Sequence, residues 1–181
     1  MVDLGCWPGG FSQVAAEIVG PRGIVVGVDR TRIDPPLESA NTISMQADLE
    51  DEAVCERVLE ALGGRPADLV LCDAAPKLSG VRDVDRAAES RLLEAIEALL
   101  PRLLRGGGDL LLKILEGPEA QQIDRRIRTG FARAKAARSR ATRKGSSERY
   151  LVARGYRGSG TDPPPGQAPG EAPTDQEGKR M

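Results

Sequence analysis

The chain has 181 residues, of which 40% are apolar and only 3% aromatic, and its formal net charge is −1. This length suits one domain, and an apolar content made mainly of Val, Leu, Ile and Ala is typical of parallel strands buried beneath helices. The sequence contains no histidine, and its cysteines (Cys6, Cys55 and Cys72) are odd in number and show no CxxC spacing, which argues against a zinc site. No window resembles a signal peptide or a membrane span. We therefore expect a protein without metal, in a reduced, cytoplasmic setting and away from membranes.

Strand and helix patterns alternate along the chain. Strands are expected at about 1–4, 23–29, 42–46, 67–73 and 109–115, with further candidates near 131–137 and 149–153. Helices are expected after the first strand and at about 50–62, 83–104 and 118–129, and the glycines at 106–108 are expected to end the third of these. This alternation predicts an α/β fold with a mostly parallel, doubly wound sheet and a ligand site at the carboxyl ends of the strands.

The most informative segment is the glycine-rich turn that follows the first strand. It reads Gly5-Cys6-Trp7-Pro8-Gly9-Gly10 and leads into an apolar helical stretch. Glycines let the backbone turn sharply and approach a ligand, and the helix N-terminus offers unpaired N–H groups. A dinucleotide-binding loop would read G-x-G-x-x-G to receive a pyrophosphate, and this turn lacks the second glycine. The loop therefore favours a cofactor without a diphosphate, such as S-adenosylmethionine.

Three acids follow the ends of predicted strands. Asp29 is suited to hydrogen bonding of ribose hydroxyls, because a carboxylate accepts two hydrogen bonds from a vicinal diol. Asp48 is placed to reach an adenine edge, but an N-cap of the next helix is an almost equally good interpretation. Asp73 opens a segment rich in proline and small residues. All three are candidates for one site at the sheet edge.

A lysine interrupts the most apolar strand of the sequence. Lys113 lies in the run Leu110-Leu111-Leu112-Lys113-Ile114-Leu115, where a buried strand would otherwise be wholly apolar. Such a lysine either extends to solvent at the strand end or is held there for a purpose, and its position favours the second interpretation. Glu148 precedes the last strand and is a candidate partner for it. A surface charge is the alternative for Glu148.

Basic residues gather between Arg125 and Arg149, where Glu148 is the single acid. We expect the Arg125–Lys144 stretch to bind a polyanion locally. Its four strongest candidate residues are Arg138, Arg140, Arg143 and Lys144. A solvated helix and loop face is the alternative. Beyond residue 156 apolar periodicity stops, so we expect a folded domain at 1–156 and a disordered tail at 157–181.

Four motifs, in order, resemble the FtsJ/RrmJ family of ribosomal RNA methyltransferases. They are Asp3-Leu4-Gly5-x-x-Pro8-Gly9-Gly10-Phe11-Ser12-Gln13-Val14, Cys72-Asp73-x-Ala75-Pro76-x-x-Ser79-Gly80, Leu112-Lys113 and Ser146-Ser147-Glu148-x-Tyr150. The resemblance implies a Rossmann-like methyltransferase fold and transfer of a methyl group from S-adenosylmethionine to the ribose 2′-hydroxyl of a uridine in large-subunit ribosomal RNA. It also implies a partner within the large ribosomal subunit, and we expect a monomer. The polyanion that the Arg125–Lys144 stretch binds would then be RNA, whose phosphates the stretch would follow.

The resemblance also implies roles for individual residues. The cofactor contacts would come from Gly5, Gly9, Phe11, Asp29, Asp48 and Asp73. The catalytic group would be Lys113, with Asp73 and Glu148 beside it. The family has a further catalytic lysine and a helix upstream of the glycine loop, and these positions precede Met1. We hypothesise that a GTG valine codon has been taken as the start, which the upstream in-frame DNA would test.

Three alternatives stay open from the sequence. The first is a methyltransferase of the same fold acting on another RNA, such as tRNA. The second is a non-catalytic RNA-binding or ribosome assembly protein that retains the cofactor pocket. The third, a nicotinamide dehydrogenase, is disfavoured by the loop spacing.

Overall fold

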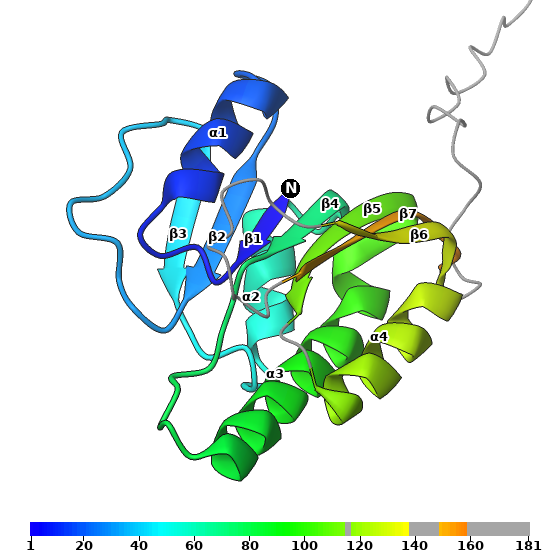
Figure 1. The fold of residues 1–181 in the computed structure, drawn as a ribbon. Helices are drawn as coiled ribbons and strands as arrows, with labels where there is room; N and C mark the ends of the chain where they lie inside the picture. The colour runs from blue at the N-terminus through cyan, green and yellow to red at the C-terminus, as the bar shows by residue number, and fades with distance from the viewer. Residues whose placement is uncertain (115–116, 138–148, 159–181) are drawn as a thin grey trace, which may run out of the picture.

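The computed structural model describes residues 1–114, 117–137 and 149–158. These residues form a seven-stranded sheet with the order β3-β2-β1-β4-β5-β7-β6 (Figure 1). The strands are β1 (Val2–Leu4), β2 (Val25–Asp29), β3 (Thr42–Gln46), β4 (Ala67–Cys72), β5 (Leu104–Ile114), β6 (Phe131–Ala137) and β7 (Arg149–Tyr156). The helices are α1 (Gly10–Val19), α2 (Val54–Ala61), α3 (Arg82–Leu103) and α4 (Pro118–Thr129). Strands β1 to β5 pair in parallel, and β7 runs antiparallel to both of its neighbours.

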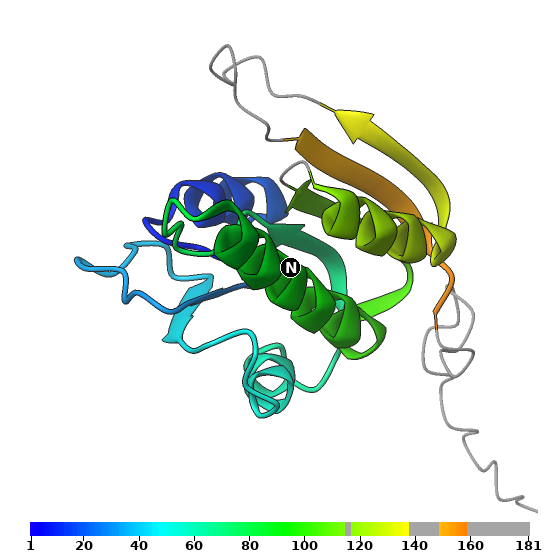
Figure 2. The ribbon, with the colours of Figure 1, turned by 60° about the horizontal axis from the view of Figure 1, so that its bottom comes forward.

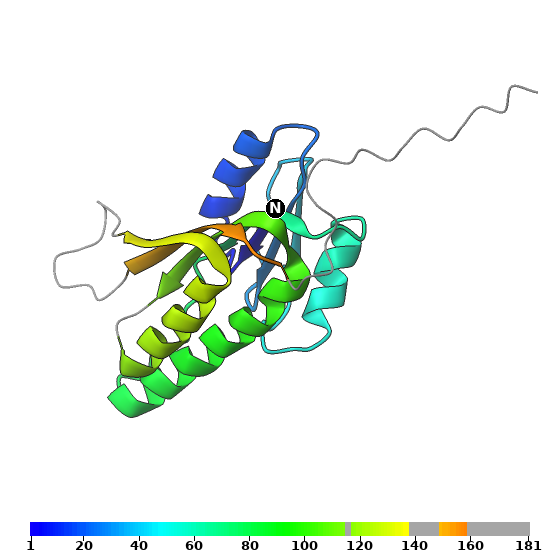
Figure 3. The same cartoon turned by 90° about the vertical axis from the view of Figure 1, so that its right-hand side faces the viewer.

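The helices cover the sheet from two sides. Ala15 and Ala16 of α1 pack against Val25 of β2 on one face. Helices α2, α3 and α4 pack on the other face with the larger apolar core. Figure 2 shows the β6–β7 hairpin at the end of the molecule opposite α2, and Figure 3 shows α1 on the other side of the sheet from α3 and α4. Within the described ranges, no helix combines the length and apolarity that a membrane span would require.

The expected doubly wound α/β fold is confirmed, including β3, α4 and β6 at their predicted bounds. One prediction at the third long helix is wrong. The glycines at 106–108 do not end a helix, because α3 ends at Leu103 and β5 begins at once. They lie in an irregular part of β5, between the pair Ala67–Leu104 and the pair Leu69–Asp109. Glycine there permits the register shift, since a Cβ on Gly108 would stand 2.7 Å from the Leu104 side chain.

The topology places several chain segments at one edge. From β1 the chain passes through α1 to β2 on one side, whereas from β3 it crosses through α2 to β4 on the other. In open α/β sheets, ligands bind outside the carboxyl ends of the strands where the strand order reverses, here beside β1 and β4. Because β7 is antiparallel, its first residues meet the last residues of β5 at the same edge.

Candidate functional site

The glycine-rich turn after β1 folds back onto β2 and β4. Gly5 has φ +80° and donates its N–H to the Val28 carbonyl oxygen at 2.8 Å. A Cβ on Gly5 would stand 2.4 Å from Cα of Ala74, so only glycine allows the two chain segments to approach. Asp73 donates its N–H to the Leu4 carbonyl oxygen at 3.0 Å, which fixes the start of the opposing segment.

Asp29, the last residue of β2, accepts hydrogen bonds that hold this turn in place. Its Oδ2 accepts the Trp7 N–H at 3.0 Å, and its Oδ1 accepts the Thr31 N–H at 2.7 Å. A carboxylate oxygen has more than one acceptor position, so both oxygens keep capacity for a ligand. The side chain therefore shapes the loop and remains able to receive a diol.

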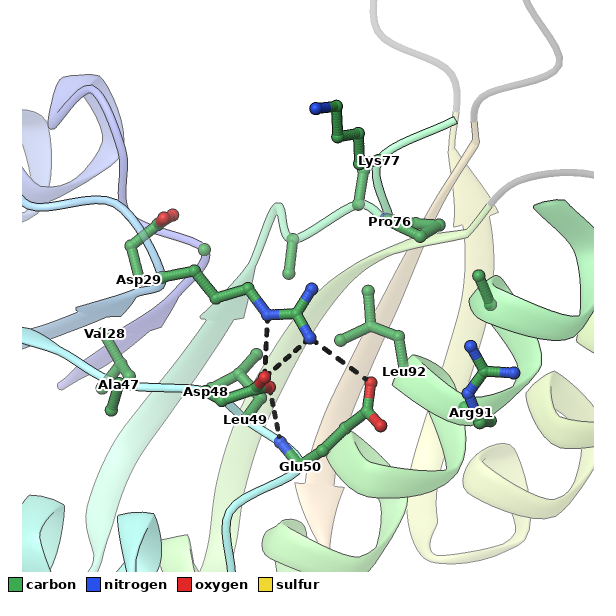
Figure 4. A pocket seen from close by; sticks show the side chains of 15 residues that line it. Val28, Asp29, Ala47, Asp48, Leu49, Glu50, Pro76, Lys77, Arg91 and Leu92 are labelled. Atoms are coloured by element: carbon green, nitrogen blue, oxygen red, sulfur yellow. Dashed lines mark hydrogen bonds and ion pairs between the residues drawn. The ribbon is translucent and has the colours of Figure 1, made fainter. Parts of the chain in front are cut away.

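Asp48 lies across the cavity from the turn and is paired with an arginine. Arg30 Nη2 lies 2.6 Å from Asp48 Oδ2 and 3.8 Å from Glu50 Oε1, contacts that Figure 4 marks with dashed lines. The Arg30 hydrogen bond is the main cause that lowers the pKa of Asp48, and the Glu50 N–H adds to it. The N-cap interpretation of Asp48 is wrong, because α2 begins only at Val54 and its N-cap is Ala53. Asp48 instead accepts the Glu50 N–H at 3.1 Å and closes a turn.

These groups surround a cavity of about 290 Å³. Its lining combines backbone from the β1 turn, acids from β2 and from the segment after β3, and residues that follow β4, and includes Gly5, Asp29, Asp48, Ala74, Lys77 and Arg91. Three predicted cofactor residues, Gly9, Phe11 and Asp73, do not belong to this lining. Gly9 has φ +114° and immediately precedes α1, and the Phe11 side chain is 38% exposed.

A second group of side chains lies on the β5 side of the same edge. Lys113 Nζ lies 3.2 Å from Asp73 Oδ1, and the lysine side chain is only 11% exposed. The Tyr150 hydroxyl donates to the same carboxylate oxygen at 2.9 Å. Tyr150 is the register partner of Lys113 across β5 and β7, which explains why the two side chains meet one acid. The predicted pairing of Asp73 with Lys113 is present, and Tyr150 joins it.

A buried acid lies beneath the glycine turn. Asp3 in β1 is fully buried, and its Oδ2 accepts the Ser12 hydroxyl at 2.6 Å while its Oδ1 has no partner among the described residues. Burial, together with the charges of Asp73 and Asp29, raises the pKa of Asp3 to about 6, although the Ser12 hydrogen bond opposes the shift. The carboxylates of Asp29 and Asp73 therefore lie close enough to Asp3 to interact with it electrostatically.

The segment that follows β4 is held by an acid at the start of α3. Asp85 Oδ1 accepts the Ser79 N–H at 2.6 Å and the Ser79 hydroxyl at 2.7 Å, and its Oδ2 accepts the Gly80 N–H at 3.1 Å. Residues 74–77 form one wall of the cavity, and the hydrogen bonds to Asp85 fix the part of the chain that follows them.

Sequence reasoning missed Arg30, Tyr150 and Asp85. Tyr150 stands in a quoted motif, but its partner depends on the register between β5 and β7. Glu148 and the predicted RNA-binding residues Arg138, Arg140, Arg143 and Lys144 lie outside the described residues, as does 159–181 of the expected tail.

Comparison with known proteins identifies the family of the chain. The family model of FtsJ-like methyltransferases matches residues 1–156. Two curated relatives are called ribosomal RNA large subunit methyltransferase E. The protein of Methanothermobacter thermautotrophicus is 39% identical over 158 residues, which cover 87% of this chain and 74% of that protein. The protein of Pseudomonas aeruginosa is also 39% identical, with 87% and 75% covered.

Solved structures share the fold at lower identity. A Plasmodium falciparum protein described as a ribosomal RNA methyltransferase superposes with a TM-score of 0.73 at 22% identity, covering 87% of this chain and 86% of that one. The fibrillarin pre-rRNA processing protein of Methanococcus jannaschii superposes with a TM-score of 0.63 at 14% identity, covering 86% and 66%. Both superpositions show that these proteins share the overall fold of this chain. Because the family model spans nearly all of the described residues, the chain belongs to the FtsJ-like methyltransferase family.

Proposed function

We propose that this protein transfers a methyl group from S-adenosylmethionine to the 2′-hydroxyl of a uridine ribose in large-subunit ribosomal RNA, acting as a cytoplasmic monomer. The names of its relatives supply the class of substrate. The single observation that carries the proposal is the meeting of Lys113, Asp73 and Tyr150 directly beside the acid-lined cavity. A buried lysine next to a cofactor cavity is the arrangement that activation of a hydroxyl requires.

The cavity has the features that S-adenosylmethionine needs. Gly5 removes the side chain that would otherwise fill the space against Ala74. Asp29 offers its carboxylate to the ribose diol, and Asp48 offers an acceptor to the adenine edge once its pairing with Arg30 rearranges. Gly9 and Phe11 do not line the cavity, so any contact that they make with the cofactor would lie outside it.

The electrostatics of the site favour a cationic ligand. Asp3, Asp29 and Asp73 lie close enough that the charges of the last two raise the pKa of the first. The unpartnered Oδ1 of Asp3 is a buried acceptor beneath the turn. A positive group bound nearby would stabilise these carboxylates, and S-adenosylmethionine carries both an ammonium and a sulfonium, which supplies the methyl group.

The residues on the β5 side would carry the proton chemistry. As a neutral amine, Lys113 Nζ would accept the proton of the 2′-hydroxyl, and as an ammonium it would stabilise the developing alkoxide; Asp73 orients the lysine through the 3.2 Å contact. Tyr150 holds Asp73 from the other side. Glu148, two residues before Tyr150, would complete the group. Positioning of the reacting atoms in line can supply roughly 7–11 kcal/mol of barrier reduction.

The direct test is transfer of tritiated methyl from S-adenosylmethionine to unmodified large ribosomal subunits, with tRNA as the competing substrate. Label in large-subunit RNA, at a nucleotide whose 3′ linkage resists alkaline hydrolysis, is the expected result. Label in tRNA alone would replace the substrate with another RNA. Binding of S-adenosylmethionine in a calorimeter without transfer to any RNA would overturn the enzymatic proposal in favour of a non-catalytic RNA-binding or assembly protein.

A further inference from the structure

One face of the β6–β7 hairpin gathers positive charge. Arg133 of β6 stands directly opposite Arg154 of β7, and Lys135 stands opposite Val152. Directly opposite residues of an antiparallel pair lie on the same face, about 4.5–5.5 Å apart at Cβ. All three basic side chains are exposed, and with Val152 they line a hollow of about 270 Å³.

This charge cluster is not balanced within the described part of the chain. No ion pair or hydrogen bond joins Arg133, Lys135 or Arg154 to an acid there. Asp109 on the neighbouring β5 accepts the Gly155 N–H at 3.0 Å through its Oδ1 and makes no ion pair with the three. Because like charges directly opposite each other destabilise a sheet, the Arg133–Arg154 pair costs stability in the unliganded protein. An anion between the two would remove that cost.

The arginines of the adjacent helix α4 are arranged differently. Arg126 Nη2 lies 2.6 Å from Glu97 Oε2, and Arg128 Nε lies 2.7 Å from the buried Asp124. Arg149 of β7 pairs with the same Asp124 at 3.1 Å. The basic stretch that the sequence presents as continuous is therefore divided: Arg126, Arg128 and Arg149 pair with acids of the described residues, whereas the exposed residues of the hairpin hollow do not.

The basic face of the hairpin and the proposed catalytic group lie on the same side of β7. Leu151 and Ala153 of β7 point into the core that α4 shares, so Tyr150, Val152 and Arg154 point to the opposite side of the sheet. Tyr150 contacts Asp73 beside Lys113. At about 3.3 Å per residue, Arg154 lies roughly 13 Å along the strand from Tyr150, a span of about four stacked nucleotides. One nucleic-acid strand can therefore touch both places.

We propose that Arg133, Lys135 and Arg154 form a binding surface for the phosphates of the substrate RNA next to the methylated nucleotide. This inference rests on the proposed function, since it takes the RNA strand as the polyanion. The surface positions the backbone without reading sequence, because the residues that line the hollow are basic or apolar and include no aromatic ring on which a base could stack. The cluster of like charges becomes favourable only when the RNA phosphates are bound.

The test compares Arg133→Gln with Arg154→Gln in one protein against the matched control Arg22→Gln with Arg65→Gln. The control removes the same charge from exposed positions that precede β2 and β4, at the opposite edge of the sheet. Binding of a fluorescent single-stranded RNA is measured by anisotropy between about 50 and about 200 mM salt. The hairpin variant should bind roughly tenfold or more weakly at low salt, with a slope of log K against log salt less steep by about 1.4, whereas the control should match the wild type.

Two further measurements, of melting temperature and of S-adenosylmethionine binding, separate loss of the surface from loss of the fold. The hairpin variant should melt at the same or a higher temperature than the wild type, since a repulsive pair is removed, and should bind S-adenosylmethionine unchanged. If it fails to fold, Lys135→Gln alone should reduce the slope by about 0.7. If the wild type transfers methyl groups to RNA but these variants keep the wild-type salt slope, the proposed phosphate-binding surface is wrong and the proposed function stands. The predicted loss of slope without methyl transfer by the wild type would overturn the proposed function and leave the surface standing.

Discussion

The two sides of the sheet's carboxyl edge are built in different ways. Toward β2 and β3, main-chain contacts set the shape, with Gly5 against Ala74 and Asp29 holding two backbone N–H groups. Toward β5 and β7, side chains contact one another, with Lys113 and Tyr150 both on Asp73. The first side is suited to holding a small molecule and the second to moving a proton. Substitutions on the two sides should therefore change different kinetic quantities.

The largest expected effect is at Lys113. Lys113→Met keeps an unbranched side chain of similar length and removes the amine that would act as proton acceptor or, when protonated, as positive charge, so kcat for methyl transfer should fall by about 10³-fold. The dissociation constant for S-adenosylmethionine, measured by calorimetry, should stay within a factor of about two to three, because Lys113 does not line the cavity. A variant with wild-type turnover would remove the lysine from the mechanism.

On the β2 and β3 side of the edge, Gly5→Ala should disturb the packing and the backbone conformation of the turn. The added Cβ meets Ala74 at 2.4 Å and the residue has φ +80°, so unfolding free energy should drop by roughly 2–4 kcal/mol and cofactor binding should weaken strongly. Gly10→Ala is the matched control, since a Cβ there has no neighbour within 4 Å. It should be neutral or slightly stabilising, as measured by urea unfolding. Equal stability of both variants would contradict the close packing at Gly5.

Asp3, beneath the turn, predicts a pH dependence of stability. Its pKa of about 6 in the folded protein exceeds the ordinary value of 3.8, so the folded state holds the proton more tightly. Its contribution is fully present below about pH 3.8 and is lost as the pH rises through 6, a change of about 3 kcal/mol. Asp3→Asn should therefore gain stability relative to the wild type between pH 4 and pH 7 in urea unfolding. A difference that stays constant across this range would contradict the shifted pKa.

A smaller effect is expected at Tyr150. Tyr150→Phe removes the hydroxyl that donates to Asp73 but leaves the contact between Asp73 and Lys113. A hydrogen bond to a charged group contributes about 1.5–3 kcal/mol, so kcat should fall by roughly tenfold to about a hundredfold with little change in cofactor affinity. A loss as large as that of Lys113→Met would instead assign Tyr150 a direct part in proton transfer.

Much of this arrangement was predictable from the sequence. Asp29, Asp73 and Lys113 lie at or next to the last residues of parallel strands, and strand direction alone brings such residues to one edge. The pairing of Tyr150 with Asp73 was not predictable, because it depends on the register of an antiparallel strand that follows a long connection. The pairing of Arg30 with Asp48 and the irregular start of β5 likewise depend on tertiary contacts, which periodicity does not report.

The measurement that most directly tests the division of the edge is single-turnover methyl transfer to large-subunit RNA as the concentration of S-adenosylmethionine is raised. Asp29→Asn should bind the cofactor roughly tenfold or more weakly, through loss of a charged acceptor, and should regain most of the wild-type rate at saturation. Lys113→Met should stay slow at every concentration. If saturation restores Lys113→Met, or leaves Asp29→Asn as slow as that variant, the separation of cofactor binding from proton chemistry is wrong.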